Sequence, residues 1–273
     1  MSTDYSNIAL FYDLATLRAL APVRRRIVEL LRGAQIHNDA ILPAAGEQAA
    51  GPEPAPGARA LRVLDIGCGT GVQLAYLSEA GFDCAGADES SQMLARAAKR
   101  CPGSCLLAPD AAGVSEAGTQ NSGPDEGAAR PDSRKHGNGC CLAQAQADNL
   151  PFADGSFDVA ILSLILHESE ADPQKILAEA ARVASRVLVV EWKMPERNLD
   201  YLYWLPMHII ERMAGKRHFR NFRAYMRSGA LEGLVYRYNL RARENGTALL
   251  ESAGYEFFRL GSLVLMDLRK KAL

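Results

Sequence analysis

The middle of the chain alternates between short apolar runs and longer stretches with apolar residues at helical spacing. The apolar runs predict five strands, at residues 61–66, 83–87, 142–148, 157–163 and 186–191. A segment such as 173–184, with Ile176, Leu177 and Ala180 on one side, predicts a helix. This alternation is typical of a parallel sheet with crossover helices. We therefore expect an α/β core.

The two ends of the chain and two internal stretches depart from this rhythm. Residues 4–33 predict two helices, and residues 244–253 predict a further helix that ends at Gly254, followed by strands at 255–260 and 262–268. Stretches rich in Pro, Ala, Gly and Ser predict loops. The predicted organisation is a helical lid at 1–42, a flexible linker at 43–59, a core at 60–191 with a surface insertion at 101–140, a helical cap at 192–243, and a C-terminal helix and strands at 244–273 that complete the core.

Composition narrows the function classes. Hydrophobic residues make up 48% of the 273 residues, enough for a full core. The formal net charge of −1 argues against a general nucleic-acid binder, which needs many uncompensated Lys and Arg. The N-terminus shows no secretory pattern, and the longest apolar run, 159–166, is too short to cross a bilayer. We expect a cytoplasmic protein without membrane insertion, as a monomer or a homodimer.

The six cysteines predict free thiols. Disulfides are rare in cytoplasmic proteins of this size. The pair Cys101 and Cys105 and the adjacent Cys140 and Cys141 do not match the paired spacing of structural zinc ligands. The sequence predicts no metal site.

The strongest local signal is a strand that runs directly into a glycine-rich turn, Val63 to Gly71 (VLDIGCGTG). Glycine permits backbone angles and close ligand approach that a Cβ would block. The spacing is Gly-x-Gly-x-Gly rather than the Gly-x-Gly-x-x-Gly that directs a helix N-terminus at a pyrophosphate. Asp65, just before the turn, would repel a pyrophosphate. The pattern therefore favours a cationic ligand over NAD.

A second acidic residue, Asp88, ends the next strand, 17 residues beyond Gly71. A carboxylate there can accept hydrogen bonds from both ribose hydroxyls of a nucleoside ligand. The alternative is a helix-capping role. Because NAD enzymes share this acidic position, it discriminates little by itself.

With these motifs the chain resembles the class I S-adenosylmethionine (SAM)-dependent methyltransferases. Asp65–Gly71 is similar to their first motif and Gly86–Leu94 to the segment after their second strand. Ala147–Asp158 (ADNLPFADGSFD) resembles the type 11 branch, which includes ubiquinone and menaquinone biosynthesis methyltransferases. The resemblance spans residues 60–191 without the insertion. It implies a doubly wound, Rossmann-like sheet of seven strands, the last antiparallel, with SAM as cofactor.

The resemblance also implies roles for individual residues. The methionine part of SAM would lie on Asp65 and the turn, and Asp88 would hold the ribose. Met93 would contact the adenine, unless it is only a core residue, and Asp148 would accept from the adenine amino group, unless it only ends a strand. Tyr5 and Tyr12 resemble aromatic lid positions over the sulfonium. The full cofactor set is Asp65, Gly67, Cys68, Gly69, Gly71, Asp88, Glu89, Met93, Asp148, Asn149, Ser163, Leu164 and Tyr12.

His167 follows the fourth predicted strand and is the candidate catalytic base, because the pKa of histidine lies near neutrality. The alternatives are a histidine that only orients a ligand, and Glu168 as the base. Beyond it, residues 211–243 are rich in Arg, Lys and aromatic side chains. We interpret this window as a cap for an anionic substrate rather than a nucleic-acid surface or a solvated helix face. The candidate substrate contacts are His167, His208, Arg217, His218, Arg220 and Tyr225.

The predicted function is methyl transfer from SAM to a small-molecule acceptor, without a nucleic-acid partner. A non-catalytic binder of SAM or S-adenosylhomocysteine would carry the same cofactor motifs. An RNA methyltransferase that uses the basic cap is a further alternative. Ser163–Leu166 (SLIL) stands where enzymes that methylate exocyclic amino groups carry an Asn-Pro-Pro-Tyr-like segment, which disfavours that chemistry.

Overall fold

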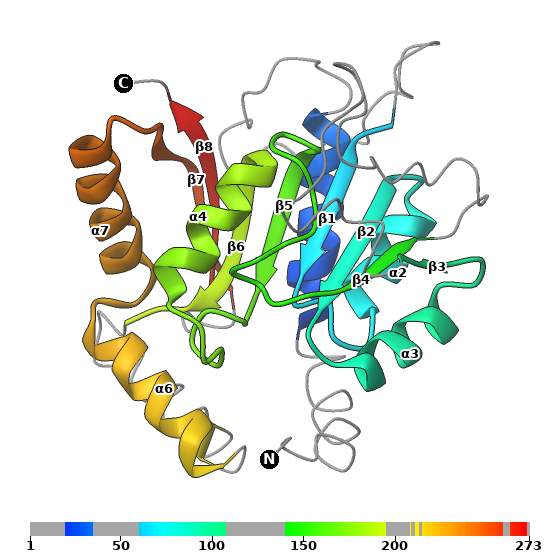
Figure 1. Cartoon of the computed structure of the whole chain (residues 1–273), viewed down its shortest axis with the longest axis horizontal. Coiled ribbons are helices and arrows are strands. Elements are labelled where there is room, and N and C mark those ends of the chain that lie inside the picture. The colour runs from blue at the N-terminus through cyan, green and yellow to red at the C-terminus, as the bar shows by residue number, and fades with distance from the viewer. Residues whose placement is uncertain are drawn as a thin grey trace, which may run out of the picture.

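The fold is one mixed sheet of eight strands with helices on both faces (Figure 1). The computed structural model of the chain describes residues 20–34, 60–107, 140–194, 208, 211–212, 215–258 and 263–271. The strand order is β3-β4-β2-β1-β5-β6-β8-β7. The strands are β1 (Arg62–Ile66), β2 (Asp83–Asp88), β3 (Cys105–Leu106), β4 (Cys141–Gln144), β5 (Phe157–Ser163), β6 (Ala184–Trp192), β7 (Leu249–Phe258) and β8 (Leu263–Lys271).

The strand order indicates at which end of the sheet a ligand would bind. From β1 the chain moves outward through β2 to β3 and β4, then returns to β5 on the other side of β1. Strands β1 to β6 all run parallel to one another. In such sheets ligands bind outside the carboxyl ends of the strands, where the order reverses. That point lies between β1 and β5, at the end of the sheet where α6 (Lys216–Arg227) also lies (Figure 1).

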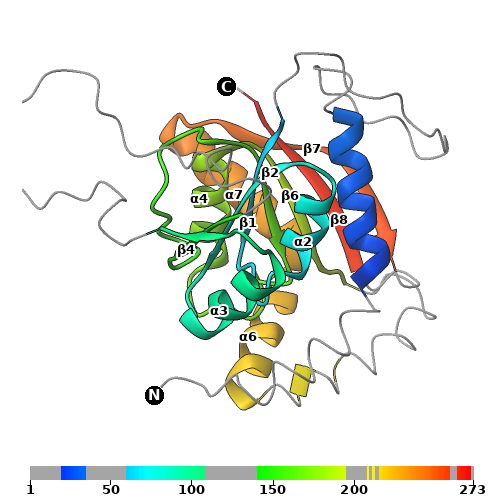
Figure 2. The ribbon, with the colours of Figure 1, turned by 90° about the vertical axis from the view of Figure 1, so that its right-hand side faces the viewer.

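Helices cover both faces, as a doubly wound sheet requires. The helix at 20–34 packs on one face with α2 (Val72–Glu79) and α3 (Ser91–Arg100), and the other face carries α4 (Pro173–Val183) and α7 (Ala230–Asn245). Figure 2 shows the helix at 20–34 beside β7 and β8. Arg26 of this helix donates to both carboxylate oxygens of Glu256 on β7, at 2.8–3.0 Å.

The sheet has eight strands, so the predicted number of seven is wrong. The extra strand is the two-residue β3, which pairs with β4 at the edge. The chain turns after α3 at Gly103 and returns along β4, where Cys105 and Leu107 donate backbone hydrogen bonds to it. These residues belong to the surface insertion that the sequence predicts at 101–140. The prediction of an antiparallel last strand is confirmed, because β8 runs antiparallel between β6 and β7.

The prediction of a helix at 244–253 is also wrong. Helix α7 continues to Asn245 and ends at Gly246, whose φ of 64° is left-handed. Strand β7 then begins at Leu249 and continues past Gly254 through a bulge. The side chain of Asn239 accepts from Leu250 N–H and donates to Leu250 C=O, both at 2.8 Å. This contact from α7 fixes the start of β7. The local sequence pattern does not predict the contact.

Several predictions fall outside the described residues. These are the lid aromatics Tyr5 and Tyr12, the linker at 43–59 and residues 108–139 of the insertion. Within the described part of the chain, no helix is both long and apolar enough to cross a membrane.

Candidate cofactor and acceptor site

The glycine turn after β1 stands at the point where the strand order reverses. Gly67 and Gly69 have left-handed φ angles of 71° and 52°. A Cβ on Gly67 would lie 2.4 Å from Ile165 Cδ1, so the turn packs directly on the loop after β5. A Cβ on Gly69 would meet no atom of the described residues within 4 Å. The turn therefore presents bare backbone to open space, as close approach of a ligand requires.

Asp88 connects this turn to the end of β2. Its Oδ2 accepts from Gly69 N–H at 2.8 Å, and its Oδ1 accepts from Ser90 N–H at 2.9 Å. Burial raises the pKa of Asp88, and the two hydrogen bonds oppose that rise. An ionised carboxylate has lone pairs beyond these two bonds. Asp88 can therefore hold the turn and still accept from ligand hydroxyls.

Asp65 is buried at the carboxyl end of β1, with 2% of its surface exposed. Burial raises its pKa to about 7, Arg24 lowers it, and Asp88 raises it further. A buried carboxylate with so high a pKa favours a cationic ligand, which would restore its charge.

The other predicted cofactor residues lie at the same edge of the sheet with different orientations. Met93 stands in the first turn of α3, where its N–H donates to the Ser90 hydroxyl at 3.3 Å. Asp148 and Asn149 follow β4, the neighbour of β2, and the exposed Glu89 follows Asp88 directly. Cys68 differs, because its buried thiol packs against Gly86 in the sheet. Only its backbone is free to face a ligand.

The end of β5 carries a strained turn. Leu164 has a φ of 59°, which is unfavourable for a residue with a Cβ. Its N–H donates to Val190 C=O at 2.8 Å, which fixes the loop to β6. Backbone strain of this kind concentrates at functional sites. Ser163 precedes Leu164, and Ile165 contacts the glycine turn.

His167 lies inside the protein, with 1% of its surface exposed. Its Nδ1 is 2.8 Å from Glu191 Oε2, and its Nε2 is 3.6 Å from Glu211 Oε1. Desolvation lowers the pKa of His167, but the two carboxylates together raise it well above the ordinary value. Both ring nitrogens of His167 therefore face a carboxylate. Its role as a catalytic base stays a prediction, beside the alternative of a histidine that orients its surroundings.

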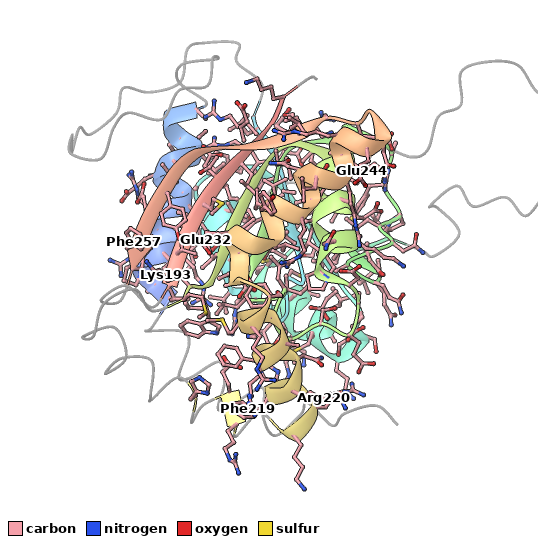
Figure 3. The ribbon with its side chains drawn as sticks, turned by 90° about the vertical axis from the view of Figure 1, so that its left-hand side faces the viewer. Lys193, Phe219, Arg220, Glu232, Glu244 and Phe257 are labelled. Atoms are coloured by element: carbon pink, nitrogen blue, oxygen red, sulfur yellow. The ribbon has the colours of Figure 1, made fainter. Side chains whose placement is uncertain are left out.

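Two of the other predicted substrate contacts gather around His167. The ring of His218 on α6 lies 5.6 Å from that of His167, and the ring of Tyr225 lies 6.3 Å from it. His208 instead packs edge-on against Phe222, at 5.2 Å. Arg217 is exposed and pairs with Glu170, and Arg220 is exposed on α6 (Figure 3). Of the two cap helices that the structure describes, α6 lies at the strand ends, whereas α7 packs on α4 and β7.

Glu191 and Glu211 were not singled out from the sequence. Glu191 accepts from Leu166 N–H at 2.8 Å as well as contacting His167. Glu211 accepts from the indole of Trp192 at 3.0 Å and contacts His218. A usable signal exists for Glu191 alone, because a charged residue at the end of the apolar run VLVV needs a buried partner.

Comparison with known proteins gives one family and several similar chains. Residues 64–186 match the methyltransferase domain family. An uncharacterised methyltransferase of Synechocystis sp. is 26% identical over 149 residues, which are 54% of this chain and 53% of the relative. The chain thus spans about half the length of this curated relative.

Solved structures with a similar arrangement are distant. A SAM-dependent methyltransferase of Thermotoga maritima, described as a possible histamine N-methyltransferase, is 17% identical over 95% of this chain and 97% of its own, with a TM-score of 0.46. Magnesium protoporphyrin IX methyltransferase of Synechocystis, with bound S-adenosylhomocysteine, is 17% identical over 78% of this chain and 75% of its own, with a TM-score of 0.43. The fold itself is defined by the strand order given above.

Proposed function

We propose that this protein, in which residues 64–186 match the methyltransferase domain family, is a SAM-dependent methyltransferase of the type 11 branch that methylates a small molecule held between the end of β5 and α6. SAM supplies a methyl group on a sulfonium and leaves as a neutral thioether. The protein then needs mainly to align the acceptor and exclude water, which can be worth about 7–11 kcal/mol in favourable cases.

The residues at the strand ends fit SAM chemically. The open backbone at Gly69 leaves room for close ligand approach. We propose that Asp88 accepts from the ribose hydroxyls and that Asp65 lies near the cationic methionine end. Asp148, Asn149 and Met93 would hold the adenine, as the family pattern implies.

The position of α6 carries the proposal of a small acceptor. Asn221 on α6 donates from Nδ2 to the backbone oxygens of Glu168 and Ser169, both at 3.3 Å. Phe222 and Tyr225 of the same helix are buried against the core. We infer that a helix held this closely to the end of β5 favours a small acceptor over a polymer. Arg217, one of the basic residues of the helix, is also paired with Glu170.

The test is the destination of the methyl group. We expect that purified protein, incubated with methyl-tritiated SAM and a cell extract, places label in the small-molecule fraction. Label in RNA would overturn the proposal in favour of the RNA alternative. If SAM binds but no fraction is labelled, the proposal fails in favour of a non-catalytic binder. Heat-inactivated extract, supplemented in turn with RNA, protein or metabolites, shows which of these three kinds of acceptor takes up the label.

SAM binding should weaken at acid pH because of Asp65. Its carboxyl is protonated below a pKa of about 7 in the free protein, and a bound cation stabilises the ionised form. Binding then requires loss of that proton at low pH, so the affinity should fall roughly tenfold between pH 8 and pH 6. Titration calorimetry at several pH values measures this. Asp65→Asn should bind more weakly and without that dependence, and equal pH dependence in both proteins would exclude Asp65 as the source.

A further inference from the structure

Three side chains at the carboxyl end of β5 converge on one point without being adjacent in the sequence. They are His167 after β5, Glu211, and His218 on α6. One ligand atom from each lies within 4.8 Å of the other two. Two imidazoles and a carboxylate form a donor set found in catalytic zinc sites and in non-haem iron sites.

The orientation of His167 matches that of a metal ligand. Its Nδ1 contacts Glu191 at 2.8 Å, which leaves Nε2 directed at Glu211. Nε2 is fully buried, and it forms no hydrogen bond with any residue that the structure describes. Histidines that bind a metal almost always have a carboxylate or carbonyl on the other ring nitrogen, which fixes the tautomer. Glu191 occupies that second position.

Glu211 and His218 repeat the arrangement. Glu211 is buried, and its Oε1 accepts from Trp192 Nε1 at 3.0 Å, which fixes the carboxylate. His218 directs Nε2 at Glu211 Oε2 and has Nδ1 3.8 Å from Glu168 Oε2. Both histidines therefore turn Nε2 toward one carboxylate and Nδ1 toward a second, outer carboxylate.

We propose that His167, Glu211 and His218 bind a divalent transition-metal ion, with Zn²⁺ as the expected occupant. Around a tetrahedral zinc with bonds of about 2.0–2.1 Å, neighbouring ligand atoms lie about 3.3 Å apart. His167 Nε2 and Glu211 Oε1 are already 3.6 Å apart. Glu211 and His218 are in direct contact and would separate to admit the ion. Three protein ligands leave the fourth position open, and the ion would fasten α6 to the end of β5.

The competing explanation is a hydrogen-bonded group of two histidines and one glutamate that binds no ion. It accounts for the contact between His218 and Glu211, but it leaves the buried Nε2 of His167 unsatisfied. A bound ion satisfies Nε2 and the two neighbouring donors together. The inference does not depend on methyl transfer, and its tests measure metal binding directly.

The first experiment is metal titration of the purified full chain after removal of metals with a chelator. We expect one equivalent of Zn²⁺ per chain and a melting temperature that rises with zinc. Co²⁺ in its place should give visible d–d bands without sulfur-to-cobalt charge transfer, because the ligands are nitrogen and oxygen. Charge-transfer bands would place the ion on the cysteines and overturn the proposal, as would the absence of stoichiometric binding.

Variants test the ligands. His218→Ala and Glu211→Gln should each weaken zinc binding at least 100-fold, whereas His208→Ala, a histidine near the same helix, should retain it. Glu191→Gln should weaken it about 10–100-fold, as loss of an outer partner does. Unchanged affinity in His218→Ala would overturn the proposal. SAM titration of each variant separates loss of folding from loss of the metal site. The cobalt spectrum is measured on the unchanged chain, so it tests the ligand type even where a variant does not fold.

Discussion

Asp88→Ala is expected to weaken SAM binding at least 100-fold. The carboxylate accepts from Gly69 N–H at 2.8 Å and from Ser90 N–H at 2.9 Å, and the proposed ribose contact would be a third bond. Hydrogen bonds to a charged acceptor are worth about 1.5–3 kcal/mol each. Loss of the bonds to the turn and the ribose should therefore cost about 3 kcal/mol or more, which is over 100-fold in Kd.

Titration calorimetry with SAM and S-adenosylhomocysteine measures the effect. Asp88→Asn keeps one acceptor oxygen and should give an intermediate loss. Asp83→Ala is the matched control. Asp83 is the first residue of β2 and lies at the opposite end of that strand from Asp88, so this variant should leave the affinity unchanged. An affinity for Asp88→Ala within threefold of the unchanged chain would show that the ribose lies elsewhere.

The cofactor half of the site is predictable from the sequence because its signals are local. Asp65, the glycine turn and Asp88 lie within one strand–helix–strand unit, and parallel pairing of β1 with β2 brings these strand ends together. The glycine spacing gives the backbone geometry, and the acidic residues give the sign of the ligand's charge. Such short-range patterns specify the edge of the sheet without knowledge of the remaining fold.

The acceptor half is not predictable in the same way, because its partners are distant in sequence. His167 contacts Glu191 across 24 residues, and His218 comes from a helix that follows a further stretch of chain. Glu211 lies in the basic stretch 211–243, where the sequence alone indicates only a counter-charge to the Arg and Lys residues. Its burial against Trp192 and His218 depends on where α6 docks. Tertiary packing, rather than local pattern, selects these residues.

The prediction for the C-terminal region is wrong for a related reason. Residues 244–253 have mixed helix and strand propensities, and the contact between Asn239 and Leu250 decides between them. The edge strand β3 is also set by its neighbour, since two residues become a strand only beside β4. Propensity is overridden by pairing in both places.

Asp267→Ala is expected to lower the free energy of unfolding by about 3–5 kcal/mol, because it leaves a buried Arg unpaired. Asp267 on β8 accepts from Arg186 Nε at 2.8 Å and from Nη2 at 3.1 Å, and the two residues are 1% and 8% exposed. The pair joins β6 to β8.

The double variant Arg186→Met, Asp267→Leu separates the loss of the pair from the exposure of its remaining partner. It removes both charges and fills similar volume, so it should recover most of the stability lost in Asp267→Ala, as replaced buried ion pairs often do. Arg269, whose Nη2 lies 3.4 Å from Asp267 Oδ2, has 23% of its side chain exposed, which gives its guanidinium a route to solvent. Urea unfolding with linear extrapolation gives the three free energies. A loss below 1 kcal/mol in Asp267→Ala, or a double variant no more stable than the single one, would show that the buried guanidinium finds other partners.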